Sequence, residues 1–104
     1  MIFTKYRRRY REVEAVQWTG NNRDEVTALV GAGYFDTFAE YPCLDDPEAT
    51  ATLLESEHSS WQLVYTNDWI VRDDHGRRFR CRAVEFAAEY EPVAAPTGVE
   101  GEAR

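Results

Sequence analysis

The chain has 104 residues, of which 43% are hydrophobic and 13% aromatic, and its formal net charge is −7. This length suffices for one small domain whose core needs no metal ion or disulfide for support. No run of 18 apolar residues occurs, so the sequence predicts no membrane-spanning helix and a protein that stays in the cytoplasm. A protein this acidic is a poor nonspecific ligand for nucleic acids.

The charged residues are segregated along the chain. Positions 5 to 11 hold five basic residues, and positions 72 to 82 hold another five. From Asp24 to Asp68 there are ten acidic residues and no Lys or Arg. The two basic segments predict either two solvated basic strands or, if they meet in space, one positively charged patch.

The N-terminal part predicts two extended segments and a helix. Residues 1–11 mix aromatic and basic residues, which favours an arm at the edge of a sheet. Residues 12–18 alternate in polarity and predict a strand with at least one buried face. Asn22 is expected to cap a short helix, with Glu25 reaching back to it as in a capping box, and one of the next two glycines is expected to end it.

The middle of the chain gives weaker signals. Residues 34–41 and 50–57 each predict a strand, and an acidic loop that contains a proline separates them. Trp61, Leu63 and Tyr65 would then share one face of a further strand. The pair Thr66-Asn67 predicts a tight turn after it.

The clearest signal is a hairpin between residues 68 and 82. Two alternating runs flank Asp74-His75-Gly76, a loop whose glycine can adopt the positive φ that the turn requires. Counting outward from this loop predicts an apolar face, with Val71 opposite Phe79 and Trp69 opposite Cys81. On the other face the predicted pairs are Arg72 with Arg78, Ile70 with Arg80, and Asp68 with Arg82.

The C-terminal part predicts one helical turn at residues 83–86 and a last strand at residues 87–91. Residues 94–104 offer little apolar surface to bury, so we expect a flexible C-terminal tail. Together the elements predict one α+β domain over residues 1–93, with a strongly twisted antiparallel sheet of about five strands and one short helix.

Several of these segments carry a recurring pattern. Tyr6 and the arginines after it lead into V-E-A-V-Q-W at residues 13–18, the sequence N-D-W-I occupies residues 67–70, and the last segment, residues 86–92, ends in Y-E-P. Gly76, Phe79 and Cys81 also belong to the pattern. In these residues the chain resembles a family of small proteins from bacteriophages and prophages of Gram-positive bacteria.

The resemblance covers both ends of the domain and leaves residues 34–60 uncovered. The chain departs from the family at Asn67, Tyr10 and Arg82-Ala83, where glycine, proline and lysine-proline are usual. Asparagine also tolerates positive φ, so the turn at Asn67 is still expected. The resemblance implies a phage genome and the cytoplasm of a bacterial host, and it carries over no catalytic residue.

The sequence contains no motif for catalysis or metal binding. The residues that could ligate zinc lack the short spacing of structural zinc sites; they are Cys43, Cys81, His58 and His75. The two cysteines do not indicate a disulfide scaffold. The consecutive residues Asp73-Asp74-His75 would point apart in a turn, which does not suit general acid and base catalysis. We therefore expect no enzyme activity, no metal and no cofactor.

Arginines are the candidate binding residues. Four of them on one strand face, two directly opposed, repel one another in a way that mixed charges would avoid. Guanidinium groups suit carboxylates and phosphates. The predicted binding residues are Arg72, Arg78, Arg80 and Arg82, extended by Arg7 and Arg9 of the N-terminal arm. We predict a non-enzymatic phage accessory protein that binds a host or phage macromolecule, most simply a protein, through this basic hairpin face.

Two alternatives stay open. An exposed tryptophan beside Arg80 or Arg82 would suit a nucleobase whose phosphates are held by arginine, which predicts a nucleotide- or nucleic-acid-binding module. Otherwise, acidic residues from the middle of the chain fold over the basic face and neutralise it, which would leave no binding site there.

Overall fold

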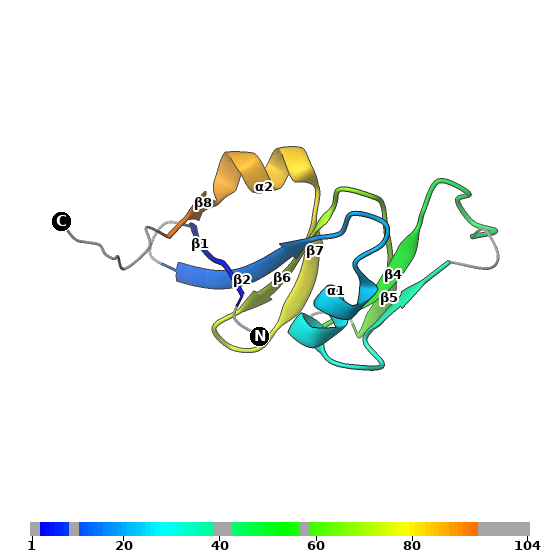
Figure 1. Cartoon of the computed structure of the whole chain (residues 1–104), viewed down its shortest axis with the longest axis horizontal. Helices are drawn as coiled ribbons and strands as arrows, with labels where there is room; N and C mark the ends of the chain where they lie inside the picture. The colour runs from blue at the N-terminus through cyan, green and yellow to red at the C-terminus, as the bar shows by residue number, and fades with distance from the viewer. Residues whose placement is uncertain (1–2, 9–10, 39–42, 57–58, 94–104) are drawn as a thin grey trace.

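The computed structural model describes residues 3–8, 11–38, 43–56 and 59–93 (Figure 1). Within them the chain forms a five-stranded and a three-stranded antiparallel sheet with two short helices, so the α+β prediction is confirmed. In chain order the elements are β1 (Lys5–Arg8), β2 (Arg11–Gln17), α1 (Arg23–Val30), β3 (Phe35–Thr37), β4 (Ala51–Glu55), β5 (Ser60–Val64), β6 (Trp69–Asp73), β7 (Arg78–Cys81), α2 (Ala83–Glu89) and β8 (Glu91–Pro92). Neither of these helices has the length and apolar character needed to cross a membrane.

The five-stranded sheet has the order β7-β6-β2-β1-β8 and lies between the two helices (Figure 1). Its central strand β2 is buried on both faces, with Val13 and Ala15 on one and Val16 on the other. β1 pairs with β2 and β8, so the N-terminal arm is not the edge predicted for it. The two basic segments come close together, because β2, which begins at Arg11, pairs with β6, and Glu14 of β2 forms ion pairs with both Lys5 and Arg72. β1 and β7 themselves are not neighbours in the sheet.

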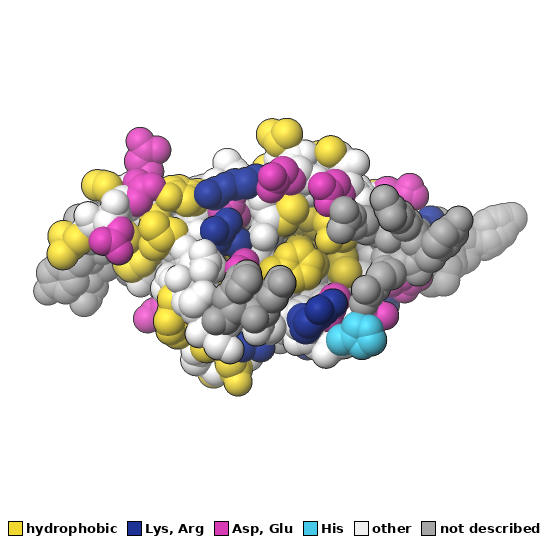
Figure 2. Space-filling view, turned by 180° about the vertical axis from the view of Figure 1, so that it is seen from behind, with side chains coloured by type: hydrophobic (Ala, Val, Ile, Leu, Met, Phe, Trp, Pro, Cys, Tyr) yellow, Lys and Arg dark blue, Asp and Glu magenta, His cyan; other side chains and the backbone are white. Residues whose placement is uncertain are grey.

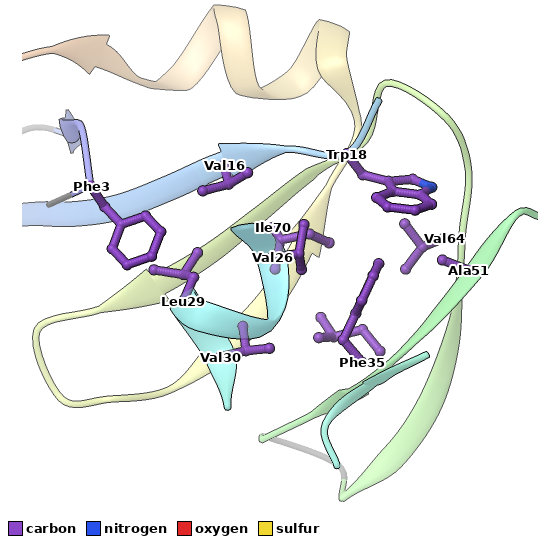
Figure 3. Close-up of a cluster of buried hydrophobic side chains, with 11 residues drawn as sticks. Phe3, Val16, Trp18, Val26, Leu29, Val30, Phe35, Ala51, Val64 and Ile70 are labelled. Carbon is purple, nitrogen blue, oxygen red and sulfur yellow. The ribbon is translucent and has the colours of Figure 1, made fainter. Parts of the chain in front are cut away.

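The larger core lies where α1, the five-stranded sheet and the three-stranded sheet meet (Figure 3). Trp18 is 1% exposed, packs edge-on against Phe35 at a centroid distance of 5.1 Å, and donates from Nε1 to Thr50 Oγ1 at 2.9 Å. α1 buries Val26, Leu29 and Val30, whose helical spacing places them on one side of the helix. The three-stranded sheet, of order β3-β4-β5, is an addition to the single sheet that the sequence predicted.

The residues before α1 confirm a helix start but not its predicted cap. Asn22 precedes the helix, yet its Oδ1 accepts from the backbone N–H of Thr19 at 2.9 Å rather than from the helix. Asn22 Nδ2 donates to Gln17 O at 2.8 Å and to Glu25 Oε1 at 2.9 Å, so the two side chains contact each other while the Asn22 side chain makes no capping bond to the helix backbone. Gly31, with φ of 103°, ends the helix as predicted.

A second core lies under α2. Phe86 is 3% exposed and stacks between Trp69, at a centroid distance of 4.1 Å, and Tyr90, at 4.7 Å. The predictions of a single turn at residues 83–86 and of a strand over residues 87–91 were wrong, because the helix continues to Glu89. The spacing of four between Phe86 and Tyr90 places both rings on the side that faces the sheet, and the Ala-Ala-Glu sequence between them favours helix.

The hairpin has the predicted register. Trp69 pairs with Cys81, Ile70 with Arg80, Val71 with Phe79 and Arg72 with Arg78. Gly76 adopts φ of 81° in the loop. Asp73 Oδ1 accepts from the backbone N–H groups of His75 and Arg77, both at 2.9 Å, and thereby holds the loop closed. The C-terminal tail predicted for residues 94–104 lies outside the described residues.

We expect Gly76→Val to lower the free energy of unfolding by at least about 1 kcal/mol, because β-branched residues resist positive φ. A Cβ at Gly76 would meet no atom within 4 Å, so the cost is one of backbone conformation rather than of packing. Gly76→Asn is the matched control and should lose less, since asparagine tolerates this region. Denaturant unfolding measures both, and equal midpoints for the glycine and valine proteins would contradict the loop.

Asp73 should contribute a pH-dependent part of the stability. Partial burial alone would raise the pKa of Asp73, but the N–H donors of Arg77 and His75 and the Arg77 guanidinium outweigh it and lower the pKa. A lowered pKa in the folded state means that the stabilisation is complete above the unfolded pKa of about 3.9 and is lost as the pH falls through the folded value. The stability difference between the parent and Asp73→Asn should therefore shrink between pH 5 and pH 2; a constant difference in urea unfolding would contradict this. Those pH limits are roughly a unit or two on either side of the unfolded pKa.

Candidate interaction surface

Arg72 lies on the predicted basic hairpin face, with its guanidinium held by other parts of the chain. Its Nη1 donates to the carbonyl of Leu29 at 3.1 Å, at the end of α1. Its Nη2 forms an ion pair with Glu14 on the neighbouring strand β2. Arg72 therefore ties α1 to the sheet and balances the charge of a glutamate.

Arg78 lies where the two sheets join. The backbone N–H of Leu54 donates to Tyr34 O at 2.9 Å, and that of Ser56 donates to Arg78 O at 3.1 Å. Since alternate residues of a strand direct their backbone groups to the same side, one edge of β4 pairs first with β3 and then with β7. Arg78 Nε donates to Leu54 O at 2.9 Å, and the Arg78 guanidinium lies over the Tyr34 ring at 3.7 Å. The Arg78 side chain therefore lies at the point where the edge of β4 changes its partner from β3 to β7.

Arg80 shares its strand face with the buried Ile70, toward the interior between the sheets. Its backbone N–H donates to Glu55 Oε2 at 2.9 Å, and its Nη2 contacts Gln62 Oε1 at 3.4 Å. Its Nε is buried and has no hydrogen-bond partner among the described residues. The side chain thus bridges β7 and β5 from the inside.

Arg82 pairs with Asp68, as the register predicted. The distance from its Nη1 to Asp68 Oδ2 is 2.8 Å, and the same oxygen accepts from the backbone N–H of Tyr65 at 3.0 Å. Arg82 also lies over the Tyr65 ring at 4.4 Å. Asp68 is only 4% exposed, so the aspartate of the N-D-W-I sequence holds the turn between β5 and β6.

The turn between β5 and β6 also contacts the acidic loop before β4. The Tyr65 hydroxyl donates to Asp46 Oδ2, and Asp46 Oδ1 accepts from the backbone N–H of Glu48 at 3.1 Å. The hydrogen bond with Tyr65 is the main cause that lowers the pKa of Asp46, and the same bond raises the pKa of Tyr65. These polar side chains act as structural contacts of a turn.

Arg7, one of the two N-terminal candidates, lies on β1, which is not a neighbour of the hairpin strands β6 and β7. Arg7 forms an ion pair of 3.5 Å with Glu91 on β8, and Arg9 lies outside the described residues. Figure 2 shows Lys and Arg side chains in separate groups, with acidic and hydrophobic side chains between them. The four hairpin arginines do share one strand face, but each contacts a carbonyl, a carboxylate or an amide of its own chain.

The described residues contain no group of three or more His, Cys, Asp or Glu side chains that could hold a metal ion. A surface cleft of about 320 Å³ lies beside the hairpin loop. It is lined by Glu55, Asp73, Arg77, Arg78 and Phe79. Two acidic and two basic side chains balance each other there, so the cleft offers no net charge to select an ion.

The three tryptophans have different environments. Trp18 belongs to the larger core and Trp69 packs under α2, whereas Trp61 on β5 is 50% exposed. Trp61 lies opposite Leu54, while the Arg80 guanidinium contacts Gln62, the next residue on β5. Adjacent strand residues point to opposite faces, so Trp61 and the Gln62 side chain that contacts Arg80 lie on opposite faces of β5. The nucleobase alternative, an exposed tryptophan beside Arg80 or Arg82, stays a prediction.

The three-stranded sheet turns one face to the core and one outward. Phe35, Leu53 and Val64 are at most 3% exposed and face the core. The alternate residues form what we call the outer face: an apolar row of Tyr34, Leu54 and Trp61 across the strands, and beside it a row of Asp36, Thr52 and Leu63. Tyr34 is 38% exposed and Trp61 is 50% exposed. The sequence signal for this surface was the shared face of Trp61, Leu63 and Tyr65, but its role could not be read from it.

Comparison with protein-family models, curated proteins and solved structures gives no match to this chain. No residue role is therefore transferred from another protein. The contacts, burial and charges of the described residues carry the functional assignment.

We expect the double reversal Arg78→Glu with Arg80→Glu to destabilise the fold by at least about 2 kcal/mol. It removes the bond to the Leu54 carbonyl and places one carboxylate beside Glu55. The control is Arg7→Glu with Arg23→Glu, which changes the net charge equally but breaks two ion pairs whose partners are all more than 40% exposed. Such pairs contribute about 0–1 kcal/mol each. Equal denaturant midpoints for the two double variants would instead support a solvated basic face that is open to a partner.

Proposed function

We propose that the protein is a non-enzymatic phage accessory protein that binds another protein in the cytoplasm of a bacterial host, and that it does so through the outer face. The phage and host setting is what the resemblance of the V-E-A-V-Q-W and N-D-W-I segments implies. The binding class is the one expected from the sequence. The surface differs from the basic hairpin face, because the arginines of that face already have partners within the chain.

The observation that carries the proposal is the composition and exposure of the outer face. Its row of Tyr34, Leu54 and Trp61 is apolar, and Arg78 supplies one positive charge at the Tyr34 end. Tryptophan, tyrosine and arginine are the residue types that contribute most to protein–protein binding energy. Burying an exposed aromatic side chain against a partner gains the transfer free energy of its apolar surface, which a solvated sheet face forgoes.

The chemistry of the partner follows from the same residues. An apolar row with a cation at one end is complementary to a protein surface that presents aliphatic or aromatic side chains and one carboxylate beside Arg78. The polar clusters elsewhere have structural roles: Asp68 holds a turn and Asp73 holds a loop. Catalysis is therefore no part of the proposal.

Affinity capture from the native host, with matched variants, tests this function. Recovery of the partner captured by the parent protein should fall at least about tenfold with Tyr34→Ser and Leu54→Asn combined, since each removes apolar contact area from the row. Val84→Ser is the control, because Val84 is an apolar residue 82% exposed on α2, away from this sheet. Capture that is undiminished by the double variant, or diminished equally by Val84→Ser, would contradict the outer face as the binding surface.

The same preparation distinguishes the nucleotide alternative. The purified parent protein should show no excess absorbance near 260 nm, as expected when aromatic residues alone absorb. An excess there, removed together with bound material by denaturation, would favour a carried nucleotide or nucleic acid and would contradict the proposed protein partner.

A further inference from the structure

Three of the four sheet edges in the described residues are protected against pairing with another chain. β8 has only two residues, one of them proline, and β3 has three residues with a charged side chain in the middle. On β7 the backbone N–H of Arg78 donates to Ser56 Oγ at 3.0 Å and that of Arg80 to Glu55 Oε2. Short strands, proline, charge and covering groups are the usual means by which proteins block edge-to-edge association.

Among the described residues, β5 has none of these protections. It is five residues long, reads Ser-Trp-Gln-Leu-Val, and contains no charge, glycine or proline. In the sheet order it pairs with β4 alone. An uncharged edge strand of this length is a template for a further strand.

The orientation of the backbone at this edge follows from the ladder on the other side of β4. Leu54 directs its N–H to β3, so by alternation Leu53 directs its own to β5, where it pairs with Gln62. The backbone N–H and carbonyl groups of Gln62 therefore face β4. The backbone groups of Trp61 and Leu63, two N–H donors and two carbonyl acceptors, face outward from the sheet.

We infer that the protein forms a two-fold symmetric dimer in which β5 pairs antiparallel with β5 of a second copy, Trp61 opposite Leu63. This register uses all four outward groups of each strand. Shifting it toward the C-terminus would require Tyr65, whose N–H and carbonyl are already bonded to Asp68. Shifting it toward the N-terminus would require Ser59, whose φ of 49° takes it out of the extended conformation.

The side chains in this register complement themselves, as a two-fold contact requires. On the outer face each Trp61 meets a Leu63, and aromatic–aliphatic cross-strand pairs of this kind are favourable. On the inner face Gln62 meets Gln62 and Ser60 meets Val64. Because β5 carries no charge, two chains of net charge −7 meet there without opposing like charges. A second copy is therefore the occupant that this edge fits.

The dimer would extend the proposed binding surface. The two three-stranded sheets become one continuous sheet, which joins both outer faces into one surface with Trp61 and Leu63 of the two copies at its centre. This consequence rests on the proposed function, whereas the dimer itself does not. Strands of five residues bury less than the roughly 1,200 Å² of a stable interface, so the dimer should form only as the protein concentration rises.

Molar mass measured by sedimentation equilibrium over a range of concentrations tests the inference. The molar mass of the parent protein should rise with concentration from that of the monomer toward twice that value. Trp61→Lys with Leu63→Lys should stay monomeric, because lysine then faces lysine across the contact. Trp61→Lys with Leu63→Glu should dimerise, because this register sets lysine opposite glutamate. The two variants alter the same two positions, so any loss of monomer stability is closely matched between them.

A monomeric parent at every concentration, or dimerisation of the double-lysine variant, would overturn the inference; if both variants are monomeric the assigned register is wrong.

Oxidative cross-linking gives a second measurement that keeps the apolar residues intact. Gln62→Cys places the two thiols at a non-hydrogen-bonded pair with a Cα separation of about 4.5 Å, within disulfide range. Ser60→Cys is the control, because Ser60 faces Val64. Equal cross-linking of both would also overturn the pairing. Partner capture uses Tyr34 and Leu54, so a failed dimer and a failed binding surface are told apart.

Discussion

The change of partner along one edge of β4 is the constraint on which the rest of the structure depends. The edge pairs with β3 through Leu54 and with β7 through Ser56, and the Arg78 side chain supplies the hydrogen bond missing between them. Because the two sheets are joined there, they diverge and leave an interior that α1 and Trp18 fill. Without Arg78, the Leu54 carbonyl would lose its hydrogen bond, which costs about 1–3 kcal/mol for a buried acceptor. One guanidinium therefore stabilises the junction of the two sheets.

Local chemistry explains which parts of the fold were predictable. The hairpin register followed from Gly76 and from strict alternation, both of which act within a few residues. The length of α2 was underestimated because the decisive term is the stacking of Phe86 between Trp69 and Tyr90, and the sequence alone did not place Trp69 beneath a helix. The sequence did not predict the three-stranded sheet as a separate unit. Its backbone hydrogen bonds change partner from Tyr34 to Arg78 between Leu54 and Ser56, and no turn signal in the sequence marks this change.

The arginines show why a charge pattern is a weak guide to a binding site. The predicted register correctly placed Arg72, Arg78 and Arg80 on one strand face, and Arg82 follows directly after β7. The sequence could not show that carbonyls of Leu29 and Leu54 lie within reach, because those contacts span more than twenty positions and depend on how the sheets pack. Of the acidic residues in the middle of the chain, Asp68 forms an ion pair with Arg82, whereas the glutamate that pairs with Arg72 is Glu14 of β2. Backbone and amide oxygens accept from Arg78 and Arg80. Guanidinium groups have five donors, so they can hold a corner together as readily as they bind a ligand.

The contrast between the edges has a physical meaning that exposure alone would not reveal. Exposed apolar residues are common on protein surfaces, and Trp61 by itself would need no explanation. Its strand is different, because length, proline, charge or covering side chains block the other three edges, whereas no such feature blocks this one within the part of the chain that the structure describes. Self-association at β5 would also remove the hazard of indiscriminate strand addition, since the second copy occupies the outward groups of Trp61 and Leu63. A single glutamate or lysine in β5 would block the edge at little cost to the stability of the monomer. β5 contains no charged residue, as expected for an edge strand that pairs with a second copy.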